Sequence, residues 1–124
     1  MIRDHLLKHG HLTVMPTTRM LRHWWSRLNA EVFNSELLPA QITYGDEATD
    51  GFTTEECDGV TFPLGGQRVR LHVASSQTTK AAVLATLAHE MIHQWQYQHD
   101  QPMTHGVAFD SWASLIKAET GLTC

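Results

Sequence analysis

The spacing of apolar residues along the chain predicts three helices and three short strands. The first helix begins at Pro16-Thr17-Thr18 and ends near residues 33–35, and Pro39 prevents it from continuing. Residues 1–15 have only weak periodicity, and we interpret them as a helical or loosely ordered arm. One face of the first helix follows a helical i, i+3, i+4 repeat and is expected to be buried. This face comprises Leu21, Trp24, Trp25, Leu28 and Val32.

The middle of the chain predicts short strands separated by polar turns. Residues 41–45 form the first expected strand and residues 60–62 the second, which Pro63 is expected to close. Residues 68–73 alternate between apolar and polar side chains, as a half-buried strand does. The expected buried face comprises Val69, Leu71 and Val73, and the expected surface face comprises Arg68, Arg70 and His72.

A long helix is predicted over about residues 78–98, because this stretch is rich in Ala and Leu, lacks Gly and Pro, and begins with Thr residues that can cap it. Pro102 lies in the following loop, and a last helix is expected over about residues 107–119. The order of elements predicts a single α+β domain over residues 1–124, with a small mixed or antiparallel sheet packed on the long helix. The expected core positions of the two helices are Leu84, Ala88, Met91, Ile92, Trp95, Phe109, Trp112, Ala113 and Ile116.

The candidate chemistry lies in His89-Glu90-Met91-Ile92-His93. Residues four apart on a helix share one face, so His89 and His93 can place two imidazole nitrogens on one zinc ion. Glu90 lies beside that position without being forced to ligate the ion. A carboxylate there can take a proton from a water that zinc activates, which is the general-base role in zinc-dependent peptide hydrolysis.

Zinc in catalytic sites usually has three protein ligands, so the sequence must supply one more. His99 has the spacing of the H-E-x-x-H-x-x-G-x-x-H pattern, but Gln96 stands where that pattern has the helix-ending glycine. His105 follows the helix-terminating Pro102, which lets the chain reverse toward the metal. We therefore favour His105 as the third ligand and keep His99 as the alternative.

The segments 89–93 and 105–109 resemble the H-E-x-x-H and later H-G-x-x-F motifs of the SprT-like (Spartan) metalloprotease family. Residues 28–39 are similar to the family's first helix and its exit, and the resemblance extends over about residues 20–118. It implies a minimal zincin-like fold and a zinc metalloendopeptidase. The implied zinc ligands are His89, His93 and His105, and the implied catalytic residue is Glu90. Characterised relatives degrade proteins crosslinked to DNA, so DNA-associated proteins are candidate substrates.

Composition limits the partners that we expect. The net charge of −4 gives no support to binding of DNA by the domain's own charge, so we expect a protein or peptide substrate. No apolar stretch approaches the ~20 residues of a membrane span, and the start of the chain shows no signal-peptide pattern. The only cysteines, Cys57 and Cys124, are far apart in sequence, and we expect Cys57 to be a packing residue. These features predict a cytoplasmic protein that does not contact membranes.

The expected mechanism has Glu90 deprotonate the attacking water and pass the proton to the leaving amine. We expect the strand at 68–73 to offer an edge to which an extended substrate can pair. His99 and Tyr97 are alternatives for stabilising the oxyanion, although a solvated helix end is the simpler interpretation. The main rival function is a non-catalytic, zinc-containing module that binds a peptide or partner.

Overall fold

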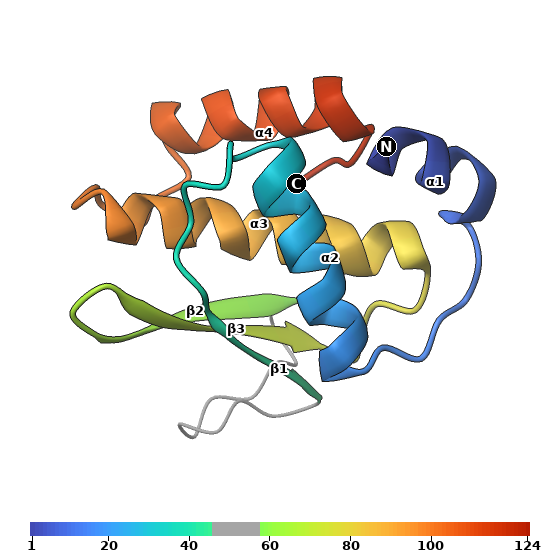
Figure 1. The fold of residues 1–124 in the computed structure, drawn as a ribbon, viewed down its shortest axis with the longest axis horizontal. Helices are drawn as coiled ribbons and strands as arrows, with labels where there is room; N and C mark the ends of the chain where they lie inside the picture. The colour runs from blue at the N-terminus through green and yellow to red at the C-terminus, as the bar shows by residue number, and fades with distance from the viewer. Residues whose placement is uncertain (46–57) are drawn as a thin grey trace.

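A computed structural model describes residues 1–45 and 58–124, which form four helices and one three-stranded sheet (Figure 1). This arrangement confirms the predicted α+β class. In chain order the elements are α1 (Ile2–His9), α2 (Thr18–Glu31), β1 (Gln41–Gly45), β2 (Gly59–Gly65), β3 (Arg68–Ala74), α3 (Lys80–Gln98) and α4 (Val107–Thr120).

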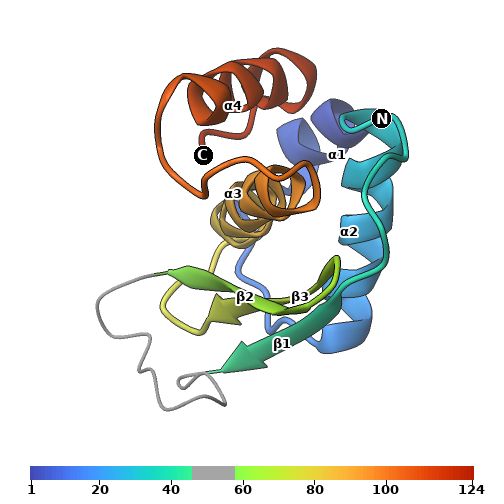
Figure 2. The same ribbon diagram turned by 90° about the vertical axis from the view of Figure 1, so that its left-hand side faces the viewer.

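The sheet has the order β1-β3-β2, with β1 parallel and β2 antiparallel to β3. Leu71 at the centre of β3 pairs with Ile42 on one side and with Thr61 on the other. Helix α3 lies between the sheet and α4, and α2 packs beside α3 (Figure 2). The long helix is therefore covered on several sides by other elements, which fixes its position relative to the sheet.

The prediction that β3 offers a free edge is wrong, because β3 is the central strand. Within the described ranges, β1 and β2 each pair only with β3, so these two strands form the edges of the sheet. The prediction that Pro63 ends this strand is also wrong, since β2 continues through Pro63 to Gly65 with a register shift between those two residues. An edge strand tolerates proline because its outward-facing backbone groups need no strand partner.

The prediction that His72 lies at the surface is wrong as well: the residue is 1 % exposed. Its strand neighbours in the ladder, Thr43 on β1 and Val60 on β2, flank it on both sides. The Nε2 atom of His72 donates to the carbonyl of Gly45 over 3.1 Å, and the Thr43 hydroxyl lies 2.6 Å from Nδ1. Burial lowers the pKa of His72, so the neutral ring serves as a buried cross-strand link.

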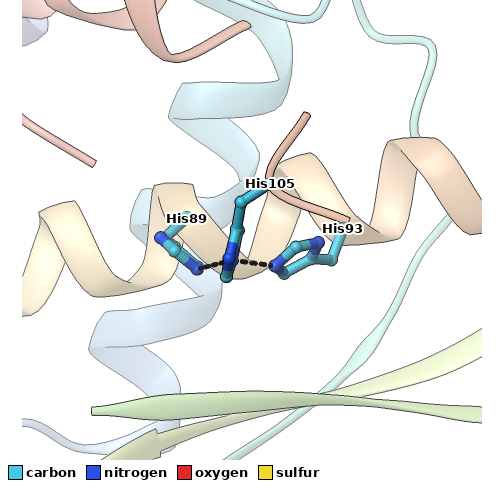
Figure 3. A group of neighbouring side chains, drawn as sticks. All are labelled: His89, His93 and His105. Carbon is cyan, nitrogen blue, oxygen red and sulfur yellow. Dashed lines mark hydrogen bonds between the residues drawn. The ribbon is translucent and has the colours of Figure 1, made fainter. Parts of the chain in front are cut away.

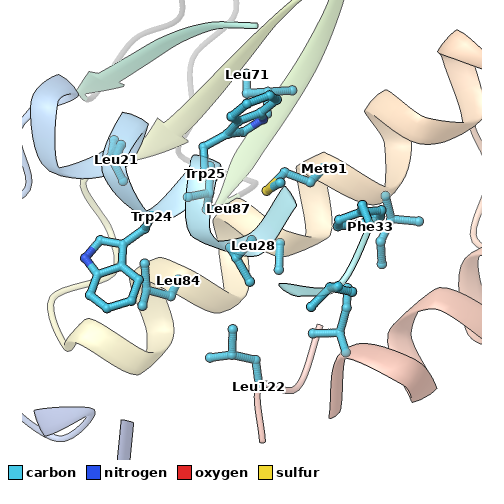
Figure 4. Close-up of a cluster of buried hydrophobic side chains, with 14 of the residues drawn as sticks. Leu21, Trp24, Trp25, Leu28, Phe33, Leu71, Leu84, Leu87, Met91 and Leu122 are labelled. Carbon is cyan, nitrogen blue, oxygen red and sulfur yellow. The ribbon is translucent and has the colours of Figure 1, made fainter. Parts of the chain in front are cut away.

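The hydrophobic core joins α2, α3 and β3 (Figure 4). All five predicted core positions of α2 are buried, which confirms the helical pattern found in the sequence. The amino-terminal arm is helical and docked, since Ile2 is buried and the Arg3 guanidinium donates to the carbonyls of Lys117 and Ala118 near the end of α4. Among the described segments, no helix has both the length and the apolar character needed to cross a membrane. Cys57 lies outside the described residues.

Candidate metal centre

Three histidines converge beside α3 (Figure 3). The Nε2 atoms of His93 and His105 are 3.1 Å apart, and those of His105 and His89 are 3.2 Å apart. His89 and His93 come from adjacent turns of α3, whereas His105 comes from the loop between α3 and α4. One ligand atom from each residue lies within 4.8 Å of the others, so the group can hold a single metal ion.

The local structure explains why the chain places His105, and not His99, in this cluster. Helix α3 is capped at its start by the Thr79 side chain, which accepts from the amide of Ala82, and it continues without a break through Gln96 to Gln98. His99 is exposed at the helix end, with its ring stacked on Trp95 at 4.3 Å. The absence of a glycine at Gln96 thus has the structural effect that the sequence predicts.

Phe109 supports the whole cluster. Its ring lies 4.8 Å from His89, 5.2 Å from His93 and 4.8 Å from His105, measured between ring centroids, and the residue is 5 % exposed. Phe109 belongs to the first turn of α4, three residues after the Gly106 N-cap. The helix that follows the loop therefore anchors the imidazoles through aromatic packing.

The environment of the two helix histidines, His89 and His93, favours their neutral form. Burial, followed by the neighbouring His93 and His105, lowers the pKa of His89 to about 4. Burial also lowers the pKa of His93. Neutral imidazoles with converging nitrogens are the donor set that Zn²⁺ and several other divalent transition metals prefer, so these residues fit such an ion.

Glu90 lies next to the three histidines, but its carboxylate does not share the position on which their ring nitrogens converge. One carboxylate oxygen is 3.9 Å from His89 Nε2, and the other, Oε1, is 2.8 Å from the Thr61 hydroxyl. The residue is 4 % exposed, and this burial raises the pKa of Glu90 to about 7. Glu90 can therefore accept and release a proton near neutral pH.

Two residues of β2 that the sequence analysis missed shape the surroundings of Glu90. The Thr61 hydroxyl donates to the backbone carbonyl and to Oε1 of Glu90, which links the edge strand β2 to helix α3. At Gly59, a Cβ atom would lie 2.9 Å from a Thr86 methyl and 3.1 Å from Glu90 Cγ, so glycine permits the close approach of β2 to α3. No local pattern marks these positions, because their importance comes from the pairing of β2 with the rest of the fold.

The alternatives for oxyanion stabilisation have other contacts. The Tyr97 hydroxyl donates to the carbonyl of Gly66 at the tip of the β2–β3 hairpin, over 2.7 Å. His99 Nδ1 lies 2.9 Å from the Trp95 carbonyl. His99 therefore lies at the exposed end of α3, whereas the half-buried Tyr97 links that end to the hairpin.

An open cleft of about 630 Å³ lies in front of the three histidines. One wall comes from the start of β2, another from α3, and a third from the chain after α4. The cleft has the size of a site that accepts a small ligand or a few residues of a polypeptide. Its lining includes Asp58, Gly59, Val60, Thr61, Ala82, Ala85, Thr86, Met103, Thr123 and Cys124.

Comparison with known proteins shows which protein family has a sequence pattern that includes these residues. The sequence matches the SprT-like family over residues 21–124, which is most of the chain. No curated protein matches the chain. The matched region contains all three histidines, Glu90 and the edge strand β2.

Proposed function

The chain belongs to the SprT-like family, and from this membership and the three-histidine cluster we propose that it is a zinc-dependent metalloendopeptidase. The observation that carries the proposal is the combination of three converging imidazole nitrogens with a buried carboxyl group beside them. A metal site without a neighbouring base would equally fit a binding module. The position and raised pKa of Glu90 favour hydrolysis.

The metal site would be formed by His89, His93 and His105, each through Nε2. A zinc ion bound there would supply a Lewis acid that polarises a peptide carbonyl and lowers the pKa of water. Structural zinc sites are closed by a fourth protein ligand, often Cys. Among the described residues, the metal-ligating group contains three histidines and no fourth member, which favours a catalytic site with one open position.

Glu90 would act as the general base and then as the general acid. It takes the proton of the attacking water and delivers it to the amine of the departing peptide. The Thr61 hydroxyl holds Oε1, which leaves Oε2 on the side of His89 to meet the water. Burial keeps the pKa of Glu90 near 7, so both directions of proton transfer are accessible at neutral pH.

The substrate would be a protein or peptide, bound in an extended conformation. The free edge of β2 lies along the cleft, where Gly59, Val60 and Thr61 contribute to the lining. An extended chain can add to such an edge by backbone hydrogen bonds, which would carry its carbonyl groups past Glu90. Proteins associated with DNA are candidate substrates through the family resemblance, and the net charge of −4 indicates that contact with DNA would come through the substrate.

The test compares the wild type with Glu90→Gln and with Glu119→Gln, a matched change at an exposed glutamate of α4. Each protein is loaded with zinc, its zinc content is measured, and cleavage of casein and of the chain itself is followed. We expect one zinc per chain in all three proteins and loss of cleavage only in Glu90→Gln. Full activity of Glu90→Gln would contradict the proposed role of this residue. Zinc binding without cleavage by the wild type would favour the binding-module alternative.

A further inference from the structure

Gln96 is a buried polar side chain that joins two of the three histidine-bearing segments. It is 1 % exposed and lies in the last part of α3. Its amide oxygen is 2.8 Å from His93 Nδ1, and its amide nitrogen donates to the carbonyl of Thr104 over 3.0 Å. Thr104 immediately precedes His105. The Gln96 amide group therefore contacts one candidate ligand, His93, and the residue before a second candidate ligand, His105.

The hydrogen bonds of Gln96 determine the tautomer of His93. The Thr104 carbonyl can only accept, so the amide nitrogen of Gln96 must face it and the amide oxygen must face His93. An amide oxygen can also only accept, so Nδ1 of His93 must carry the proton. Nε2 of the neutral ring then has a free lone pair directed toward His105 Nε2.

This tautomer has a consequence for the cluster without metal. His105 Nε2 has two nitrogen neighbours, but it carries either one lone pair or one N–H, so it can form only one good hydrogen bond. With Nε2 of His93 unprotonated, a hydrogen bond between His93 and His105 requires the N–H to be on His105 Nε2, and the contact with His89 is then left without one. At least one of the two nitrogen–nitrogen contacts then brings together groups that do not form a good hydrogen bond, and a bound cation would relieve this conflict.

We propose that Gln96 is a positioning residue of the metal centre: it holds His93 in the metal-binding tautomer and tethers the loop that carries His105. The proposal rests on the proposed metal site. It goes beyond that site because it assigns a function to a residue that touches neither the ion nor the substrate. Partners that orient ligating histidines typically affect metal affinity by 10–100-fold.

The chain offers a matched control in Gln94, a buried glutamine two positions earlier on the same helix. Gln94 accepts from Trp25 Nε1 over 3.0 Å and donates to the carbonyl of Leu38 over 2.7 Å, so it also makes two hydrogen bonds. Replacing Gln94 or Gln96 by leucine removes a similar side chain and a similar number of hydrogen bonds. Only the change at Gln96 alters contacts with the metal-ligating segments.

The experiment measures zinc affinity by competition with a chromophoric chelator, after circular dichroism has verified folding. We expect Gln96→Leu to bind zinc about 10–100-fold more weakly than the wild type, and Gln94→Leu to bind it within about threefold. Wild-type affinity in Gln96→Leu, or an equal loss in both variants, would overturn the proposal.

A second measurement does not depend on the folding of a variant. Long-range ¹H–¹⁵N correlation spectra of the metal-free wild type report which nitrogen of His93 is protonated. We expect Nδ1–H, and a neutral ring with Nε2–H would overturn the proposal. If the wild type bound no zinc, the proposed function would fail, and this spectrum would still show whether His93 has the tautomer that its contact with Gln96 requires.

Discussion

Replacing Glu90 with glutamine in the metal-free protein should change the pH dependence of stability. Glu90 is almost fully buried, and its pKa rises from 4.5 to about 7 in the folded chain. One pKa unit corresponds to about 1.4 kcal/mol, so this difference amounts to about 3 kcal/mol. Glutamine keeps the shape of the protonated carboxyl group but cannot ionise, so comparison of the two proteins isolates the contribution of Glu90.

The sign of the effect follows from the direction of the pKa change. The folded state prefers protonated Glu90, so the stabilisation is complete below pH 4.5 and is lost as the pH rises through about 7. Glu90→Gln does not lose stability in this way as the pH rises, because glutamine cannot ionise. The stability of the variant relative to the wild type should therefore increase by about 2–3 kcal/mol between pH 5 and pH 8. The low pKa of His89 acts in the opposite direction, but it acts in both proteins and largely cancels in the comparison.

Urea unfolding in the presence of EDTA measures this difference at each pH. Glu119→Gln serves as the control, because Glu119 is exposed and its replacement should leave the difference from wild type constant. A constant difference for Glu90→Gln across the same pH range would refute the reasoning. So would a variant that loses stability relative to the wild type as the pH rises.

Three further predictions concern the same site. Thr61→Val should leave zinc content unchanged but lower kcat/KM by about 10–100-fold, because the loss of a hydrogen bond to a buried carboxylate costs about 1–3 kcal/mol, and Thr61→Ser should recover most of the activity. Phe109→Ala should destabilise the metal-free protein by about 3–5 kcal/mol in urea unfolding and also weaken zinc binding, whereas an effect below about 1 kcal/mol would contradict its supporting role. Zinc at 100 times its Kd should stabilise the wild type against unfolding by about 2.7 kcal/mol, and a chelator should reverse this stabilisation. His105→Ala should gain little stability from zinc. A full gain in that variant would exclude His105 as a ligand.

Local sequence patterns were sufficient for α2, α3 and α4 and for the grouping of His89, His93 and His105. The burial of α2 follows directly from its apolar spacing, and the position of α3 follows from its composition and its capping threonine. The choice between His99 and His105 depended on whether the helix breaks at Gln96. The continuity of the helix is a local property, so the sequence could indicate which of the two histidines lies beside His89 and His93.

The errors concern features that depend on sheet order. Alternation in β3 correctly separated two faces, but it could not show that β3 lies between two other strands. His72 is buried for that reason, although its polar neighbours in sequence suggested a surface face. Thr61 was missed for a related reason, since its contact with Glu90 joins residues 29 positions apart. Such contacts exist only after the strands have paired.

The glutamines of α3 illustrate the same limit. Gln94, Gln96 and Gln98 resemble a polar, solvated helix end in the sequence, yet all three are buried. Gln94 binds Trp25 and the segment after α2, Gln96 binds His93 and the following loop, and Gln98 binds the β2–β3 turn. Each amide satisfies backbone or side-chain groups that other elements bring to the helix, so the role of each residue becomes visible only in the assembled fold.

The most direct test of the central claim is an anomalous difference map, recorded at the zinc absorption edge from crystals of the zinc-loaded protein. The account predicts one strong peak at about 2.0–2.1 Å from Nε2 of His89, His93 and His105, with the Glu90 carboxylate nearby but not ligating. A peak bound by His99 in place of His105, or no peak beside α3, would contradict it.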